Sequence, residues 1–249
     1  MAEQSSDHFE EMNLLKNKIA IITGAVGNLG TATARVFQQA GAKTVLVDRS
    51  PDRVGTVFAD ISKSNDHLLA GGVNLSDPDS LGKLIEQTLT RFGRVDVLVN
   101  TVGAFRGGNP VLEADPADWD FLFNANVRTT LHCCRAVIPQ MLKQKSGRMI
   151  NVSSREGLEA HAGYAAYSAS KSAVLRLTES LAAELKMSDI NVNCIMPSVI
   201  DTPQNRSAMP KADFSKWVAP EAIADVIAFL ASDASRAVTG AALPVFGKG

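Results

Sequence analysis

The chain alternates short apolar runs with longer segments of helical periodicity. Near-continuous runs of Val, Ile and Leu are typical of strands buried on both faces of a sheet, and apolar residues three or four positions apart indicate amphipathic helices. Strands that alternate with helices predict right-handed βαβ units and a parallel sheet. We therefore predict one doubly wound, Rossmann-like α/β domain with a central parallel sheet of about seven strands. The predicted strands are 19–22, 44–47, 68–73, 95–99, 149–152, 191–195 and 241–245.

The pattern separates a polar N-terminal extension, 1–15, from a domain over 16–249. The extension lacks the apolar stretch of a signal peptide, and no apolar run approaches the length needed to span a bilayer. We therefore expect a cytoplasmic protein without a membrane partner. Inside the domain, 203–220 is predicted to be a short substrate lid. Its cations could attract an acidic substrate, but they could equally be solvated charges beside a packed Trp217.

Composition narrows the function classes. The 249 residues carry a net charge of −1 with no basic stripe, so we do not expect a nucleic-acid partner. The three cysteines include no C-x-x-C pair, which favours a reducing compartment and a role as small core residues. No His or Cys spacing is typical of a metal site, so no metal is expected.

The first predicted strand leads directly into the segment TGAVGNLG. Glycines between a strand and a helix let the backbone approach a pyrophosphate, whose charge then lies at the helix N-terminus. Gly24 and Gly30 fit the dinucleotide-binding pattern, whereas Gly27 comes one residue early. Asn28 stands where a middle glycine is common, and Asn tolerates left-handed backbone angles. Together with Leu29, these residues are the predicted phosphate contacts.

Asp48 ends the second predicted strand, 18 residues after Gly30. A carboxylate at this place can accept hydrogen bonds from the ribose hydroxyls of NAD, and it would repel the 2′-phosphate of NADP. The alternative is a solvated turn residue before Ser50. The neighbouring Arg49 could host a 2′-phosphate, so NAD is favoured over NADP without NADP being ruled out.

Tyr167 and Lys171 stand at i and i+4 on a predicted helix, which places both on one face. An ammonium group beside a phenol stabilises the phenolate and lowers the tyrosine pKa toward the working pH of a general acid/base. Such a pair alone is weak evidence, since it occurs by chance on many helices.

The chain resembles the short-chain dehydrogenase/reductase family, in its short single-domain branch, from about residue 18 to residue 247. Its layout is similar to that of 3-oxoacyl-carrier-protein reductases. The resemblance is carried by several motifs in the family's order. They are TGAVGNLG at 23–30, NTVG at 100–103, Asn126, the Ser153–Ser154 pair, Tyr167 with Lys171, PSVIDT at 197–202 and VTG at 238–240.

The resemblance implies a catalytic set of Asn126, Ser154, Tyr167 and Lys171. Ser154 would hydrogen-bond the substrate oxygen and Tyr167 would exchange the proton. Lys171 would tune Tyr167 and bind the nicotinamide ribose. The backbone carbonyl of Asn126 would hold a water that links Lys171 to solvent, the alternative being an exposed helix asparagine.

The resemblance also implies further cofactor contacts. Ile200 and Thr202 match positions that contact the carboxamide and phosphate. Asn100 is as consistent with a structural role as with direct contact, and Asn74 replaces the aspartate common in the family. The remaining predicted contacts are Asn74, Leu75, Asn100, Gly103, Pro197, Ile200 and Thr202.

These observations predict an NAD(P)-dependent oxidoreductase that transfers hydride between the nicotinamide and a small-molecule carbonyl or alcohol substrate. A 3-oxoacyl substrate is the default. The alternative is a catalytically silent dinucleotide-binding regulatory or scaffold protein, which would have an eroded Ser, Tyr and Lys set. A nucleotide-sugar dehydratase or epimerase would carry a longer C-terminal region.

Two predicted helices are apolar on more than one side, which suggests that a partner covers them. One lies around 117–143 and the other follows Tyr167, where Leu175, Leu177, Leu181 and Leu185 crowd together. Because these helices commonly pair between subunits in the family, we expect a homotetramer or a homodimer.

Overall fold

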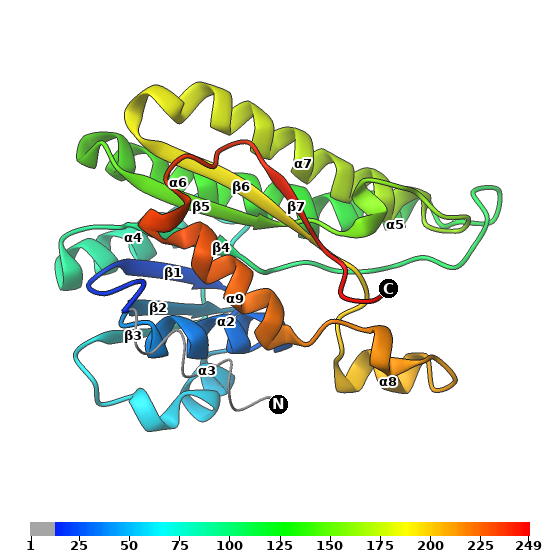
Figure 1. Cartoon of the computed structure of the whole chain (residues 1–249), viewed down its shortest axis with the longest axis horizontal. Helices are drawn as coiled ribbons and strands as arrows, with labels where there is room; N and C mark the ends of the chain where they lie inside the picture. Colours follow the sequence, from blue (N-terminus) through cyan, green and yellow to red (C-terminus); the bar gives the residue numbers. More distant parts are fainter. Residues whose placement is uncertain (1–12) are drawn as a thin grey trace.

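The computed structural model describes residues 13–249 and contains one seven-stranded sheet (Figure 1). All strand pairs are parallel, in the order β3-β2-β1-β4-β5-β6-β7. The strands are β1 (Ile19–Thr23), β2 (Lys43–Asp48), β3 (His67–Gly71), β4 (Val97–Asn100), β5 (Gly147–Val152), β6 (Ile190–Pro197) and β7 (Ala242–Val245). The predicted doubly wound α/β fold with a seven-stranded parallel sheet is therefore confirmed.

Helices cover both faces of this sheet. One face carries α2 and α9, which pack side by side, and the other carries α4, α6 and α7 (Figure 1). The helices are α2 (Asn28–Gln39), α3 (Pro51–Val57), α4 (Pro78–Phe92), α5 (Ala117–Leu122), α6 (Thr129–Gln144), α7 (Ala165–Leu185), α8 (Pro203–Ala208) and α9 (Pro220–Ala231). No helix in the described part of the chain has the length and apolar character needed to cross a membrane.

Side chains alternate between the two layers of the core, as the two-residue period of a strand requires. In β1, Ala20 and Ile22 pack with α2 and α9, whereas Ile21 packs with the helices of the other face. In β4, Val99 packs with α2 and α9, and Leu98 packs with the helices of the other face. Both faces of these strands therefore carry apolar residues, which explains the unbroken runs in the sequence.

Two sequence interpretations need correction. Leu15, assigned to the polar extension, is fully buried in the core, and its backbone N–H donates to the carbonyl of Ala40. The packed domain therefore includes the last residues of that segment, while 1–12 lie outside the described residues. Three of the four crowded leucines of α7, Leu175, Leu181 and Leu185, are buried within this chain, whereas Leu177 is half-buried. These three need no partner to cover them, and the oligomeric state stays a prediction.

The parallel strands end at one edge of the sheet. The turn after β1 and the segments after β4, β5 and β6 therefore meet there. Between β1 and β4 the chain order reverses, and ligands of open α/β sheets bind outside the carboxyl ends of the strands at such a point.

A buried polar network ties these strand ends to α7. Asn100 Nδ2 donates to Asn151 Oδ1 at 2.9 Å, and Asn151 Nδ2 donates to Thr178 Oγ1 at 2.9 Å. Both asparagines are buried, so each hydrogen bond compensates a desolvated amide. Asn100 therefore has the structural role that was one of the two possibilities for this residue.

Replacing Asn151 with Leu should destabilise the domain, because the buried Asn100 amide would lose its partner. Loss of such a partner costs about 2 kcal/mol. Chemical denaturation measures the change. The control is Ile150→Val, which shortens the neighbouring buried residue and should cost only about 1 kcal/mol. An Asn151→Leu variant as stable as the parent would contradict the role of the network.

Candidate active site

Tyr167 and Lys171 lie one turn apart on α7, at the carboxyl edge of the sheet. Lys171 is only 5% exposed, and its Nζ lies 6.0 Å from the centroid of the Tyr167 ring. The Nζ donates a hydrogen bond to the backbone carbonyl of Val152, at the end of β5, over 3.0 Å. The predicted pair is therefore on one helix face, with the amine tied to the sheet.

Burial is the largest cause of the pKa shifts of Lys171 and Tyr167. It lowers the pKa of Lys171 to about 8, against a weaker opposing effect of Cys194. Burial also raises the pKa of Tyr167, although a hydrogen bond with Ser154 opposes this and the charge of Glu156 reinforces it. The predicted lowering of the Tyr167 pKa by Lys171 is thus wrong for this structure, because desolvation of the phenolate is the largest effect.

The two serines after β5 have different surroundings. Ser153 Oγ donates to the backbone carbonyl of Lys171 at 2.8 Å, which joins β5 to α7. The hydroxyl of Ser154 is instead hydrogen-bonded to Glu156 and lies beside Tyr167. Ser154 is therefore the serine next to Tyr167, and its catalytic role stays a prediction.

Asn126 lies in a π-helical segment, Phe123–Arg128, between α5 and α6. It is 1% exposed, so the exposed-asparagine alternative is wrong. Its Oδ1 accepts from the N–H of Ala104 at 2.7 Å, and its Nδ2 donates to Ser170 Oγ at 2.9 Å. The side chain thus braces the segment after β4 against α7, beside Lys171. The water held by the Asn126 backbone carbonyl remains a prediction.

Gly103 lies against the same cluster. A Cβ at this position would come within 3.1 Å of Lys171 Nζ and 3.2 Å of Asn126 Oδ1. A larger residue would therefore press on the buried amine, which explains a glycine here without requiring a contact to a cofactor.

The turn between β1 and α2 has the geometry expected of a phosphate cradle. Gly24 has φ +65°, and a Cβ on Gly30 would overlap the carbonyl of Gly24, so both positions require glycine. The first amide with a helical acceptor is that of Thr31, which donates to Gly27. The amides that precede it, including that of Leu29, are the groups that an anion can bind at a helix N-terminus.

Asn28 does not take the left-handed conformation expected of it. It is the first residue of α2, and only Gly24 in this turn has a positive φ. Its Nδ2 donates to Gln204 Oε1 at 2.9 Å. Asn28 therefore links the glycine turn to α8, in the predicted lid.

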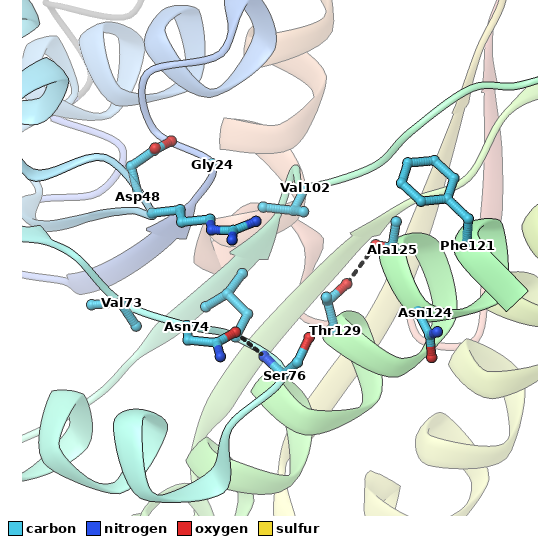
Figure 2. A pocket seen from close by; sticks show the side chains of 12 residues that line it. Gly24, Asp48, Val73, Asn74, Ser76, Val102, Phe121, Asn124, Ala125 and Thr129 are labelled. Carbon is cyan, nitrogen blue, oxygen red and sulfur yellow. Dashed lines mark hydrogen bonds between the residues drawn. The ribbon is translucent and has the colours of Figure 1, made fainter.

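A cavity of about 410 Å³ lies beside this turn (Figure 2). Asp48, Val73 and Asn74 line it from the strand ends, and Ala125 and Thr129 face them from the helices. Its full lining is Gly24, Asp48, Arg49, Val73, Asn74, Leu75, Ser76, Val102, Phe121, Asn124, Ala125 and Thr129. The predicted nucleotide residues Gly24, Asp48, Arg49, Asn74 and Leu75 thus line one cavity.

Asp48 is a turn residue whose side chain also lines the cavity. One carboxylate oxygen, Oδ1, accepts from the N–H of Ser50 at 3.0 Å, as in an Asx turn, while the side chain lines the cavity. Arg49 lines it too and is exposed. Asn74 Oδ1 accepts from the N–H of Ser76 at 3.1 Å, and this leaves the Asn74 Nδ2 amide to donate toward a ligand.

The segment after β6 reaches the opposite side of the edge. Pro197 and Thr202 are buried, and Thr202 Oγ1 caps α8 by accepting from the N–H of Asn205. In the lid, Arg206 forms two hydrogen bonds with Asp201 at 2.6 and 2.7 Å. Its charge is therefore matched within the chain, which favours the solvated-charge interpretation for this cation.

One aromatic residue near Tyr167, Phe105, was missed from the sequence. The ring of Phe105 packs edge-on against Tyr167, with centroids 4.9 Å apart, and against Tyr164 at 5.2 Å. Phe105 is 55% exposed, so it forms part of the open wall of the site. The segment after β4 carries no helical or strand periodicity, so its contacts depend on the fold alone.

The chain is similar to known proteins over nearly its whole length. A family profile described as short chain dehydrogenase matches residues 18–213. The chain is 32% identical to the 3-oxoacyl-(acyl-carrier-protein) reductase FabG of Thermotoga maritima, over 94% of this chain and 98% of that protein. The crystal structure of gox2181 superposes with a TM-score of 0.88 at 28% identity, covering 95% of this chain and 97% of the other. A structure of ElxO with NADP bound superposes with a TM-score of 0.84 at 24% identity, covering 93% of this chain and 98% of the other.

The buried Lys171 should make stability depend on pH. Its folded pKa of about 8 lies below the ordinary 10.5, so the unfolded chain binds the proton more tightly. Burial therefore costs stability below pH 8, and the cost disappears as pH rises toward 10.5. Lys171→Met should stabilise the protein near pH 7 by about 2 kcal/mol, after the lost hydrogen bond to Val152 is subtracted.

Denaturant unfolding of the parent and of Lys171→Met, near pH 7 and again near pH 10, measures the difference in their free energies of unfolding. This difference should shrink at the higher pH. The exposed Lys186 is the matched control, because its replacement with Met should give no such pH-dependent gain. A stability difference between Lys171→Met and the parent that is the same at both pH values would contradict the cost of burial.

Proposed function

Because this chain belongs to the short-chain dehydrogenase family and is an NAD(P)-dependent oxidoreductase, we propose that Tyr167 is its acid/base. The reaction is hydride transfer between the cofactor and a carbonyl or alcohol carbon. The observation that supports the proposal best is the cluster of Tyr167, Ser154 and the buried Lys171 at the strand edge. The cluster adjoins the glycine turn and its cavity, which fit a dinucleotide.

Each residue of the cluster has a chemical task. When bound, the nicotinamide supplies or accepts the hydride. Tyr167 gives its proton to the substrate oxygen in reduction, and a pKa raised by burial keeps that proton in place until it is needed. Ser154 steadies the developing charge on the same oxygen. Lys171, fixed to Val152, places a positive charge near the phenol when it is protonated.

The chain binds a nicotinamide dinucleotide, and we propose NAD as the preferred form. Asp48 lines the nucleotide cavity with a carboxylate that would accept from two ribose hydroxyls and repel a 2′-phosphate. Arg49 on the same rim is the feature that would favour NADP. The ElxO structure has NADP bound, but at 24% identity it supports the fold rather than the cofactor choice.

A 3-oxoacyl thioester is the first substrate to test, since the Thermotoga maritima relative is named for that reaction. The catalytically silent alternative is disfavoured, because Ser154, Tyr167 and Lys171 are present and adjacent.

We also propose a cytoplasmic location, since all three cysteines are unpaired and buried. A homodimer or homotetramer remains our proposal from the family resemblance alone.

Tyr167→Phe should lower turnover about a thousandfold, because it removes the proton donor while leaving the aromatic ring in place. The measurement is NADH and NADPH consumption with a panel of ketones and 3-oxoacyl thioesters. Cofactor affinity, followed by nicotinamide fluorescence, should change little in the same variant. Retained turnover would contradict the assignment of Tyr167.

Asp48→Ala should raise the affinity for NADPH relative to NADH about tenfold, a change of about 1.4 kcal/mol. The reason is that a negative charge is removed from the wall where the 2′-phosphate would lie. Fluorescence titration with each cofactor measures the ratio. Asp52→Ala, which changes an exposed carboxylate in α3, is the control. An unchanged ratio would mean that Asp48 is only a turn residue.

A further inference from the structure

The hydroxyl of Ser154 is held by a carboxylate that the sequence interpretation did not use. Ser154 Oγ donates to Glu156 Oε2 over 2.6 Å, and the N–H of Glu156 donates back to Ser154 Oγ at 3.4 Å. Glu156 belongs to the short turn at Arg155–Gly157 that follows β5, and Ser154 caps the start of this turn. A hydroxyl-to-carboxylate bond this short is charge-assisted and stronger than a neutral one.

Glu156 lines a separate cleft of about 340 Å³. The cleft is lined by Arg155, Glu156, His161, Ala162, Tyr164, Ser198 and Val199. The Glu156 side chain is 23% exposed, so the carboxylate is partly shielded from water. It therefore acts on Ser154 and Tyr167 through a medium that screens charge less than bulk solvent does.

Several titratable groups surround this carboxylate. His161 Nδ1 lies 3.8 Å from Glu156 Oε1, and the Arg155 guanidinium lies 5.4 Å from the centroid of the Phe246 ring. Tyr164 lines the same cleft, and Tyr167 and Lys171 stand across Ser154 on α7. The residues after β6 that line the cleft, Ser198 and Val199, carry no titratable group.

The hydroxyl of Ser154 has a single proton, which it gives to Glu156 in the free site. A substrate oxygen that enters the site would replace the carboxylate as the acceptor of this proton. Until then Glu156 fixes the position of the hydroxyl, and the charge of its carboxylate favours the protonated state of Tyr167.

We propose that Glu156 is a positioning residue of the catalytic site, whose carboxylate orients the Ser154 hydroxyl and holds the site ready for carbonyl reduction. The inference rests on the proposed roles of Tyr167 and Ser154. It is supported by the direction of the electrostatic effect, because the charge of Glu156 helps to raise the pKa of Tyr167. Oxidation of an alcohol, which needs the phenolate, is correspondingly held back at neutral pH.

The chain contains only two tyrosines, Tyr164 and Tyr167, so the ionisation of each can be followed directly. We would label the tyrosine ring at Cζ with ¹³C, record NMR spectra of the full-length protein as pH is raised, and assign the signals with Tyr164→Phe. In Glu156→Gln, the amide oxygen can still accept the Ser154 proton, but the charge is gone. Tyr167 should then ionise at lower pH than in the parent.

Glu159→Gln is the matched control, because it removes an exposed carboxylate three residues away and should leave the Tyr167 titration unchanged. A Tyr167 signal that titrates at the same or higher pH in Glu156→Gln would overturn the proposal. The titration requires no turnover, so it is independent of the assigned reaction. If Tyr167→Phe kept its activity, the proposed function would fail while the effect of Glu156 on the phenol could still be measured.

Turnover separates the effect of orientation from that of charge. Glu156→Ala removes both the acceptor and the charge, so the rate of carbonyl reduction should fall about tenfold below that of Glu156→Gln. Equal rates in the two variants would show that the carboxylate does not orient Ser154, and would overturn the positioning role.

Discussion

The structure depends on one costly arrangement, the burial of the Lys171 amine at the carboxyl edge of the sheet. Burial lowers its pKa to about 8, and its hydrogen bond to the carbonyl of Val152 is the compensation that the fold provides. Asn126 and Gly103 enclose the amine from the other side, and Ser153 ties the backbone of Lys171 to the sheet. These contacts join β5, the segment after β4, the π-helical segment Phe123–Arg128 and α7 around one charged group.

The parallel topology explains why this group is useful. All seven strands run the same way, so the glycine turn, the nucleotide cavity and the acid/base cluster open at one edge although they are far apart in the sequence. The apolar layers on both faces fix the strands, and the Asn100–Asn151–Thr178 network fixes the polar ends between β4, β5 and α7. The site is thus assembled on the ends of rigid elements, and the segment around α8 contacts it through the hydrogen bond of Asn28 with Gln204.

Sequence reasoning reached the features that follow from period, glycine geometry and motif order. It could predict the seven strands, the requirement for glycine at Gly24 and Gly30, and the shared helix face of Tyr167 and Lys171. It could not predict quantities that depend on three-dimensional surroundings. Burial reversed the expected pKa shift of Tyr167, and the bond from Ser154 to Glu156 joins residues whose contact no periodicity implies. The backbone conformation of Asn28 was predicted wrongly, because Gly24 already supplies the left-handed angle in this turn.

The most direct test of this account is the ionisation of Lys171 itself. With ¹⁵N-labelled lysine and the Lys171→Met variant to assign the signal, NMR follows the Nζ resonance through a pH titration of the cofactor-free protein. The account predicts a midpoint of about 8. A midpoint near the ordinary 10.5 would mean that the amine is solvated, and would contradict the buried cluster on which the proposed chemistry rests.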